Sequence, residues 1–174
     1  MSNITLSIVI PVRNNSSFLS RVFSTINSQS LGPDEVIIVD SSTDNTVYEL
    51  TNDHKYDIPI IYYRVNKAYP GKARNIGVDL ANGEWVAFLD SKTLPENDWL
   101  ERYHHLVQAY HADVVFGVTQ FDATTPFQKI LRAATYGKIG HHSVPGTLIK
   151  KKVFIDSGGF MEHVRMGEDI EWRE

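Results

Sequence analysis

The chain has 174 residues, 42% of them hydrophobic and 11% aromatic, which is enough to bury the core of one soluble domain. It contains no cysteine, which excludes disulfides and thiolate metal sites, so a metal would need carboxylate or histidine ligands. A net charge of -4 without a long basic run argues against nucleic-acid binding. Because no signal-peptide pattern or apolar run of transmembrane length is found, we expect a cytoplasmic domain.

Strand and helix patterns alternate over the first two thirds of the chain. Runs of consecutive apolar residues predict strands that are buried on both faces, and apolar residues three and four apart predict helices. In chain order we expect a strand at 6–12, a helix at 18–26, a strand at 36–40, a short helix at 47–50, a strand at 58–63, a helix at 70–80, a strand at 85–89, a helix at 97–111 and a strand at 113–119. Pro59 indicates that the third strand lies at a sheet edge.

After residue 119 the alternation is less regular. We expect a helix at 126–135, a short strand at 147–150 and a turn at Gly158-Gly159-Phe160. Residues 167–174 begin like a helix but carry no C-cap signal, so we expect a C-terminally truncated domain. The alternation as a whole predicts an α/β sandwich with a mostly parallel central sheet and helices on both faces.

Polar residues follow three of the predicted strands. Residues 11–14 end the first strand, Asp40 ends the second, and Asp90 ends the strand at 85–89. Because the carboxyl ends of parallel strands meet at one edge of a sheet, where ligands bind in open α/β folds, we expect these residues to line one site.

Six segments of the sequence resemble family 2 glycosyltransferases with the GT-A fold. They read SIVIPVRN at 7–14, VD with STD at 39–44, ARNIG at 73–77, GEWVAFLD at 83–90, GGF at 158–160 and ED at 168–169. One such motif is a weak signal, but six in the family's order are specific. The resemblance implies a single Rossmann-like GT-A domain over 1–174, with a donor-binding half at 1–119 and an acceptor-side half at 120–174.

The resemblance also assigns residues to the nucleotide of a sugar-nucleotide donor. Pro11, Arg13, Asp40 and Arg74 would hold it, with Asp40 accepting hydrogen bonds from the base. The chemistry agrees, because a base edge needs a fixed acceptor and a diphosphate needs an arginine fork or a lysine. Two alternatives stay open: Asp40 caps the following turn, and Arg74 is an ordinary exposed helix arginine.

The family's Asp-X-Asp motif, which holds Mg²⁺ or Mn²⁺ against the donor phosphates, reads Asp90-Ser91-Lys92 here. One carboxylate makes a poor metal site, and a neighbouring ammonium group repels a cation. In one interpretation Lys92 takes over part of the metal's charge, and Asp90 orients it or contacts the ribose. In the other, Asp90 keeps the metal, Lys92 faces solvent, and further ligands come from His141-His142 or from later residues.

The pair Glu168-Asp169 resembles the acidic pair near the acceptor site of the family. The resemblance implies that Asp169 is the general base that removes the acceptor's proton, with Glu168 as its neighbour or substitute. The alternative is that both are first-turn residues of a helix, where acidic side chains are favoured.

The expected function is therefore that of an inverting glycosyltransferase in polysaccharide or glycan biosynthesis. The donor would be a UDP-sugar rather than a GDP- or dTDP-sugar, and the acceptor a saccharide or lipid-linked hydroxyl. Membrane association, at the inner face, would come only from further C-terminal parts or from the acceptor. The alternative is a nucleotide-sugar-binding domain with weak or no turnover. A Rossmann oxidoreductase is set aside because no Gly-x-Gly-x-x-Gly turn follows the first strand.

Overall fold

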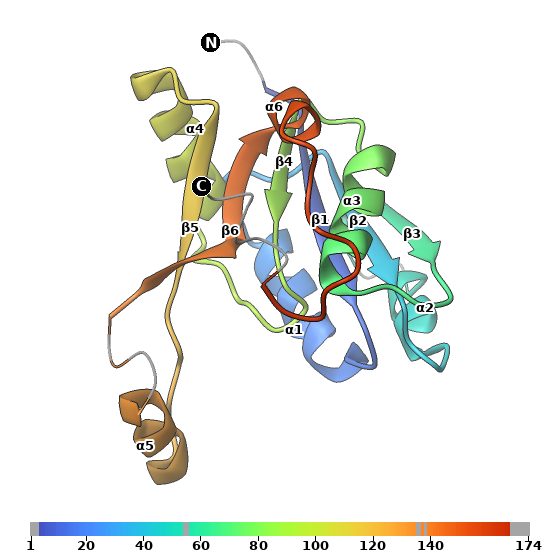
Figure 1. The fold of residues 1–174 in the computed structure, drawn as a ribbon, viewed down its shortest axis with the longest axis vertical. Coiled ribbons are helices and arrows are strands. Elements are labelled where there is room, and N and C mark those ends of the chain that lie inside the picture. Colours follow the sequence, from blue (N-terminus) through green and yellow to red (C-terminus); the bar gives the residue numbers. More distant parts are fainter. Residues whose placement is uncertain (1–3, 54–55, 135–136, 138, 168–174) are drawn as a thin grey trace.

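The structure is a computed structural model that describes residues 4–53, 56–134, 137 and 139–167. Its centre is a six-stranded sheet with the order β3-β2-β1-β4-β6-β5 (Figure 1). The strands are β1 (Leu6–Val12), β2 (Glu35–Asp40), β3 (Ile60–Arg64), β4 (Trp85–Phe88), β5 (Val114–Thr119) and β6 (His141–Lys150). Only β6 runs against the others, since it pairs antiparallel with both β4 and β5 while the remaining pairs are parallel. The mostly parallel α/β sheet and the edge position of the third strand are confirmed.

Helices cover both faces of the sheet, as predicted. Buried side chains of α1 (Ser16–Asn27), α2 (Thr46–Thr51) and α4 (Trp99–Tyr110) pack against one face, and those of α3 (Pro70–Leu80) and α6 (Lys151–Asp156) pack against the other. The remaining helix, α5 (Pro126–Ala134), covers neither face and extends away from the sheet (Figure 1). No helix in the described part of the chain is long and apolar enough to cross a membrane.

The unbroken apolar strands follow from this double cover. In β1, Ile8 and Ile10 pack into the core under α1 and α4, whereas Val9 faces the core under α3. Helix α3 approaches β1 closely at Gly77, where an added Cβ would lie 2.3 Å from a Val9 methyl group. A glycine at this point therefore sets how closely α3, and the residues it carries, lie against the sheet.

The C-terminal third departs most from the sequence expectation. Strand β6 begins at His141 rather than at 147, and α6 was not predicted because the residue before it, Lys150, gives no N-cap signal. Pro145 and Gly146 interrupt the pattern of β6, and β5 carries an irregularity opposite them, between Val115 and Gly117. Since β6 pairs with β4, the two predicted halves share one sheet, and their division into donor and acceptor sides stays a prediction. The helix expected after residue 167 lies outside the described residues.

A buried carboxylate joins the amino ends of three elements. Glu35 accepts hydrogen bonds from the Ser7 hydroxyl at 2.6 Å and from the Asn82 backbone N–H at 2.6 Å, and the Asn82 side chain donates at 2.9 Å. Burial alone would raise the pKa of Glu35, but the hydrogen bonds from Ser7, Asn82 and Gly83 together hold it below its ordinary value. This contact ties β1 and β2 to the turn that leads into β4.

We expect Glu35→Gln to lower the free energy of unfolding by about 2 kcal/mol near neutral pH, because an amide donor would face the donors that the carboxylate now accepts from. Since the folded-state pKa lies below the unfolded value of 4.5, this stabilisation is present above that value and is lost as pH falls through the folded pKa. In urea unfolding, the difference between wild type and variant should shrink from about pH 7 to about pH 3. The exposed Glu84→Gln is the control. Equal losses for the two variants would contradict this role.

Candidate functional site

The carboxyl ends of β1, β2 and β4 lie at the same edge of the sheet, as the sequence predicted (Figure 1). The register places Val12 beside Asp40, and the backbone N–H of Leu89 donates to Val9 O at 3.1 Å. The polar loops that follow these strands therefore meet at one edge, which is the candidate site.

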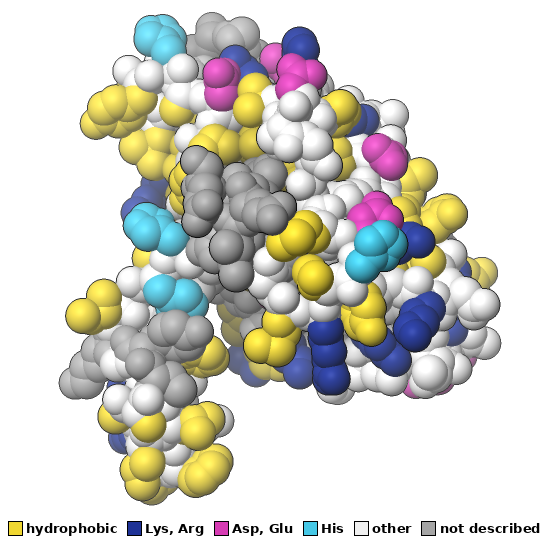
Figure 2. All heavy atoms as spheres, viewed as in Figure 1, with side chains coloured by type: hydrophobic (Ala, Val, Ile, Leu, Met, Phe, Trp, Pro, Cys, Tyr) yellow, Lys and Arg dark blue, Asp and Glu magenta, His cyan; other side chains and the backbone are white. Residues whose placement is uncertain are grey.

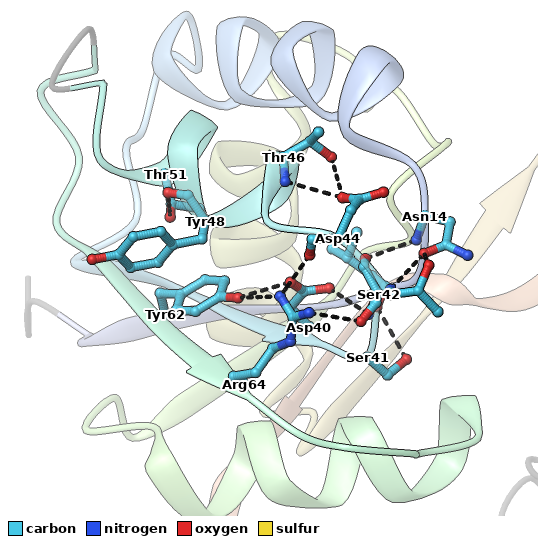
Figure 3. A network of polar contacts seen from close by, with 12 residues as sticks. Asn14, Asp40, Ser41, Ser42, Asp44, Thr46, Tyr48, Thr51, Tyr62 and Arg64 are labelled. Atoms are coloured by element: carbon cyan, nitrogen blue, oxygen red, sulfur yellow. Dashed lines mark hydrogen bonds and ion pairs between the residues drawn. The ribbon is translucent and has the colours of Figure 1, made fainter.

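Asp40 is fully buried and organises the loop after β2 (Figure 3). Its Oδ1 accepts from the Ser42 backbone N–H at 2.8 Å, and its Oδ2 accepts from the Tyr62 hydroxyl at 2.8 Å and from Arg64 Nη1 at 3.0 Å. Burial, with the adjacent carboxylate, raises the pKa of Tyr62 despite the opposing effect of Arg64. The turn-capping contact is thus present, and the role of Asp40 as a base acceptor stays a prediction.

Arg64, at the end of the edge strand β3, clamps the same loop. Besides Asp40, it donates from Nη1 to the Asp44 carbonyl and from Nη2 to the Ser42 carbonyl, both at 2.8 Å (Figure 3). Its hydrogen bond with Tyr62 and its proximity to Asp40 raise the pKa of Arg64, which stays charged. The guanidinium of Arg64 therefore fixes the loop after β2 and places a positive charge beside it.

Two asparagines join the loop after β1 to its neighbours. The backbone N–H of Asn14 donates to Ser42 Oγ at 2.8 Å, and its side-chain oxygen accepts from the Thr43 N–H at 2.9 Å. Asn15 Nδ2 donates to the Ser91 carbonyl at 3.0 Å. The three loops are thus held together, and Arg13, in the loop after β1, is exposed.

Arg74 and Asp90, both predicted site residues, form an ion pair. Arg74 Nη2 lies 2.7 Å from Asp90 Oδ1, with side-chain exposures of 5% and 41%. The Arg74 guanidinium also lies 5.6 Å from the ring centre of Phe160. Arg74 is therefore not an ordinary exposed helix arginine, and that alternative is wrong.

The Gly-Gly-Phe turn is attached to α3 beside this ion pair. Asn75 Nδ2 donates to the Phe160 carbonyl at 2.9 Å, and the Phe160 N–H donates back to Asn75 Oδ1 at 3.0 Å. The Phe160 ring packs edge-on against Phe88 of β4, with 5.2 Å between ring centroids. Because its amide pairs with both backbone groups of one residue, Asn75 fixes the ring that covers Arg74.

Among the described residues, those around Asp90 do not fit a divalent cation. The carboxylate already accepts from Arg74, and Lys92 is exposed, with no hydrogen bond or ion pair to the described residues. Within the described part of the chain, no group of three or more His, Asp or Glu residues could hold a metal. His141 begins β6 beside the end of β5, where its Nε2 is 3.3 Å from Thr119 Oγ1. Glu168 and Asp169 lie outside the described residues.

Three residues that shape the site were missed as such in the sequence: Asn15, Arg64 and Asn75. Asn14 lies within the residues 11–14 that were expected at the site. Asn75 had a usable signal, since it stands next to Arg74 in the same motif. Arg64 had none, because its partners depend on how β3 pairs with β2.

The comparisons with known proteins point in one direction. A family model described as "Glycosyl transferase family 2" matches residues 7–166. Glycosyltransferase AglE of Haloferax volcanii is 25% identical over 180 residues, covering 96% of this chain and 59% of that protein. This chain therefore spans less than two thirds of AglE.

Two solved structures share the fold. One is S. aureus TarS 1–349 in complex with UDP-GlcNAc, with a TM-score of 0.75 and 20% identity, covering 95% of this chain and 51% of that chain. The other is mannosyltransferase PcManGT from Pyrobaculum calidifontis in complex with GDP-Man and Mn²⁺, with a TM-score of 0.70 and 22% identity, covering 98% of this chain and 51% of that chain.

The two hydrogen bonds between the Asn75 amide and the Phe160 backbone, here called the Asn75 clamp, predict unequal losses of stability for substitutions at Gly158 and Gly159. Gly158 and Gly159 both have positive φ, 87° and 71°, so either substitution to alanine costs about 1 kcal/mol in backbone strain. A Cβ on Gly159 would also lie 2.9 Å from Asn75 Oδ1, whereas one on Gly158 meets nothing within 4 Å. Breaking the clamp should add about 1–2 kcal/mol to the loss for Gly159→Ala. Urea unfolding of both variants measures this, and indistinguishable losses would refute the clamp.

Proposed function

Because this chain belongs to glycosyl transferase family 2, we propose that it transfers a sugar from a nucleoside diphosphate sugar to an acceptor hydroxyl in glycan or polysaccharide biosynthesis, with inversion at the anomeric carbon. The observation that carries the proposal is the buried Arg74 held by Asp90 at the carboxyl edge of the sheet. A guanidinium fixed there suits a diphosphate, which it can bind with two parallel hydrogen bonds. TarS with UDP-GlcNAc and PcManGT with GDP-Man support this class of donor.

The base of the donor binds, in this proposal, at the loop that Asp40 organises, with Pro11 and Arg13 on the β1 side. A carboxylate has about four acceptor sites, and Ser42, Tyr62 and Arg64 use three of those of Asp40. The fourth site remains for an N–H of the base. We propose a UDP-sugar rather than a GDP- or dTDP-sugar as the donor, and the TarS structure in complex with UDP-GlcNAc is an example of that donor in the same fold.

The diphosphate is held by fixed positive charge rather than by a metal ion. Asp90 orients Arg74 through the 2.7 Å hydrogen bond, and the exposed Lys92 provides a second cation two residues further along. Negative charge grows on the diphosphate as its bond to the sugar breaks, and preorganised cations stabilise that charge. In this proposal, Arg74 and Lys92 together supply the positive charge that stabilises the departing diphosphate.

The proton of the acceptor is removed by Asp169, with Glu168 as its neighbour or substitute. The acceptor oxygen attacks the anomeric carbon from the face opposite the diphosphate, its proton passes to the carboxylate, and the bond from sugar to diphosphate breaks. One carbon–oxygen bond forms as one breaks, so the configuration inverts. The resemblance of the Glu168-Asp169 pair to the family's acidic pair supports this assignment.

A second candidate is a nucleotide-sugar-binding domain with weak or no turnover. It is favoured by one observation, namely that Asp90 is engaged with Arg74 while the second aspartate of the family's motif is replaced by Lys92. The two functions share the donor site and differ only in whether the sugar is transferred.

Replacing Lys92 tests the role of fixed charge. We expect wild-type release of UDP from a UDP-sugar to persist in excess chelator, and Lys92→Ala to lower kcat/KM about a hundredfold. Lys92→Asp restores the Asp-X-Asp pattern, so its activity should require Mn²⁺. Lys152→Asp, on α6 with its side chain 82% exposed, makes the same charge change elsewhere and should behave as wild type. Wild-type activity that falls to background in chelator and returns with Mn²⁺ would rule out the proposed role.

Replacing the general base separates transfer from binding. For Asp169→Asn we expect calorimetric affinity for UDP near that of wild type and a fall in sugar transfer of about 10²–10⁴-fold, because only proton removal is lost. Asp156→Asn, an exposed change on α6, is the control. Full turnover by Asp169→Asn would refute the assignment. UDP-sugar binding by wild type without hydrolysis or transfer would favour the binding domain instead.

A further inference from the structure

Helix α5 presents an exposed apolar face. It stands beyond the sheet on the segment between β5 and β6, and none of its residues is buried (Figure 1). Phe127 is 72% exposed and Ile130 69%, and Leu131 is also exposed. These residues are three and four positions apart, so they lie on one side of the helix. A contiguous apolar surface of this kind marks an interaction site.

The charge of this helix indicates an anionic partner. Its remaining sides carry Gln128, Lys129 and Arg132, and the helix has no acidic residue. Over residues 114–149 the sequence contains three basic residues but only one acidic residue, Asp122. The chain as a whole has a net charge of -4, so α5 is a locally cationic region on an acidic protein.

The apolar surface continues onto the segments that join α5 to the sheet. Val118 at the end of β5, Phe121 and Ile139 are all more than half exposed. Figure 2 shows hydrophobic side chains gathered at the free end of the α5 region. The surface thus combines aliphatic and aromatic side chains with nearby cations, which is the composition of helices that lie in the membrane interface.

We propose that α5 docks this protein on the surface of a membrane that contains anionic phospholipids. Phe127, Ile130 and Leu131 enter the boundary between headgroups and acyl chains, while Lys129 and Arg132 pair with lipid phosphates. A second copy of the chain fits less well, because two α5 helices packed face to face would bring like charges together with no acidic residue on either helix.

The position of α5 also sets how a docked molecule is oriented. Strand β5 points the same way as β1 and β4, so the chain leaves the sheet toward α5 at the carboxyl edge, which also carries Asp40 and Asp90. Figure 2 shows Lys and Arg side chains along this lower edge of the main body. Docking through α5 therefore turns the candidate site toward the bilayer and brings further cations near it.

Vesicle flotation of the 174-residue chain tests the proposal, with phosphatidylcholine alone and with phosphatidylcholine containing about 30% phosphatidylglycerol. Wild type should float with the anionic vesicles, and less so as salt is raised. Ile130→Gln should lower the partition coefficient about tenfold, since it removes an aliphatic side chain that the bilayer buries in the docked protein. Lys129→Gln should lower it about fivefold on anionic vesicles and leave the neutral ones unchanged.

Ile155→Gln is the matched control, because Ile155 is also exposed, at 53%, but lies on α6 at the opposite end of the molecule (Figure 1). It should float as wild type does. Wild type that stays unbound to anionic vesicles, or Ile130→Gln that binds as tightly as wild type, overturns the proposal. A lipid-free dimer that Ile130→Gln makes monomeric, without vesicle binding by wild type, assigns the face to a second copy and overturns it too.

Discussion

The ion pair between Arg74 and Asp90 is the constraint on which the geometry of the site depends. A guanidinium out of water costs several kcal/mol unless a well-placed carboxylate and further contacts compensate for it. That placement requires α3 to lie close to the sheet, which Gly77 permits, and β4 to end where it does. It also requires the ring of Phe160, which Asn75 holds by both backbone groups. The position of this ion pair therefore depends on contacts between residues that are far apart in the sequence.

What the sequence could predict follows from this arrangement. The strands at the centre of the sheet are continuous apolar runs because both faces are covered, and such runs are readable without a structure. The meeting of Asp40 and Asp90 at one edge then follows from topology. Its place in the Arg74 motif marked Asn75 as a site residue, but its hydrogen bonds to Phe160 were not predictable, since that partner lies 85 residues away. The start of β6 was hidden by Pro145 and Gly146, which are unusual in a strand.

The replacement of a carboxylate by Lys92 changes the electrostatics of the whole edge. A divalent cation needs several hard anionic ligands, whereas a diphosphate needs positive charge. At the end of β4 an ammonium group stands beside a lone carboxylate that is already paired with Arg74, and this arrangement repels a divalent cation but attracts a diphosphate. In the proposed function the charge is therefore built into the chain, in place of the cation that accompanies GDP-Man in PcManGT.

The amphipathic pattern of residues 126–135 predicted a helix, but only the structure reveals that this helix packs against no described element of the core. In water the exposed apolar face of this nine-residue helix has little reason to persist, whereas at a lipid surface the same face supplies the binding free energy. A helix this short binds reversibly, so docking would hold the site near the bilayer without fixing it there. A site turned toward the membrane suits a lipid-linked acceptor, whose hydroxyl group would approach from that side.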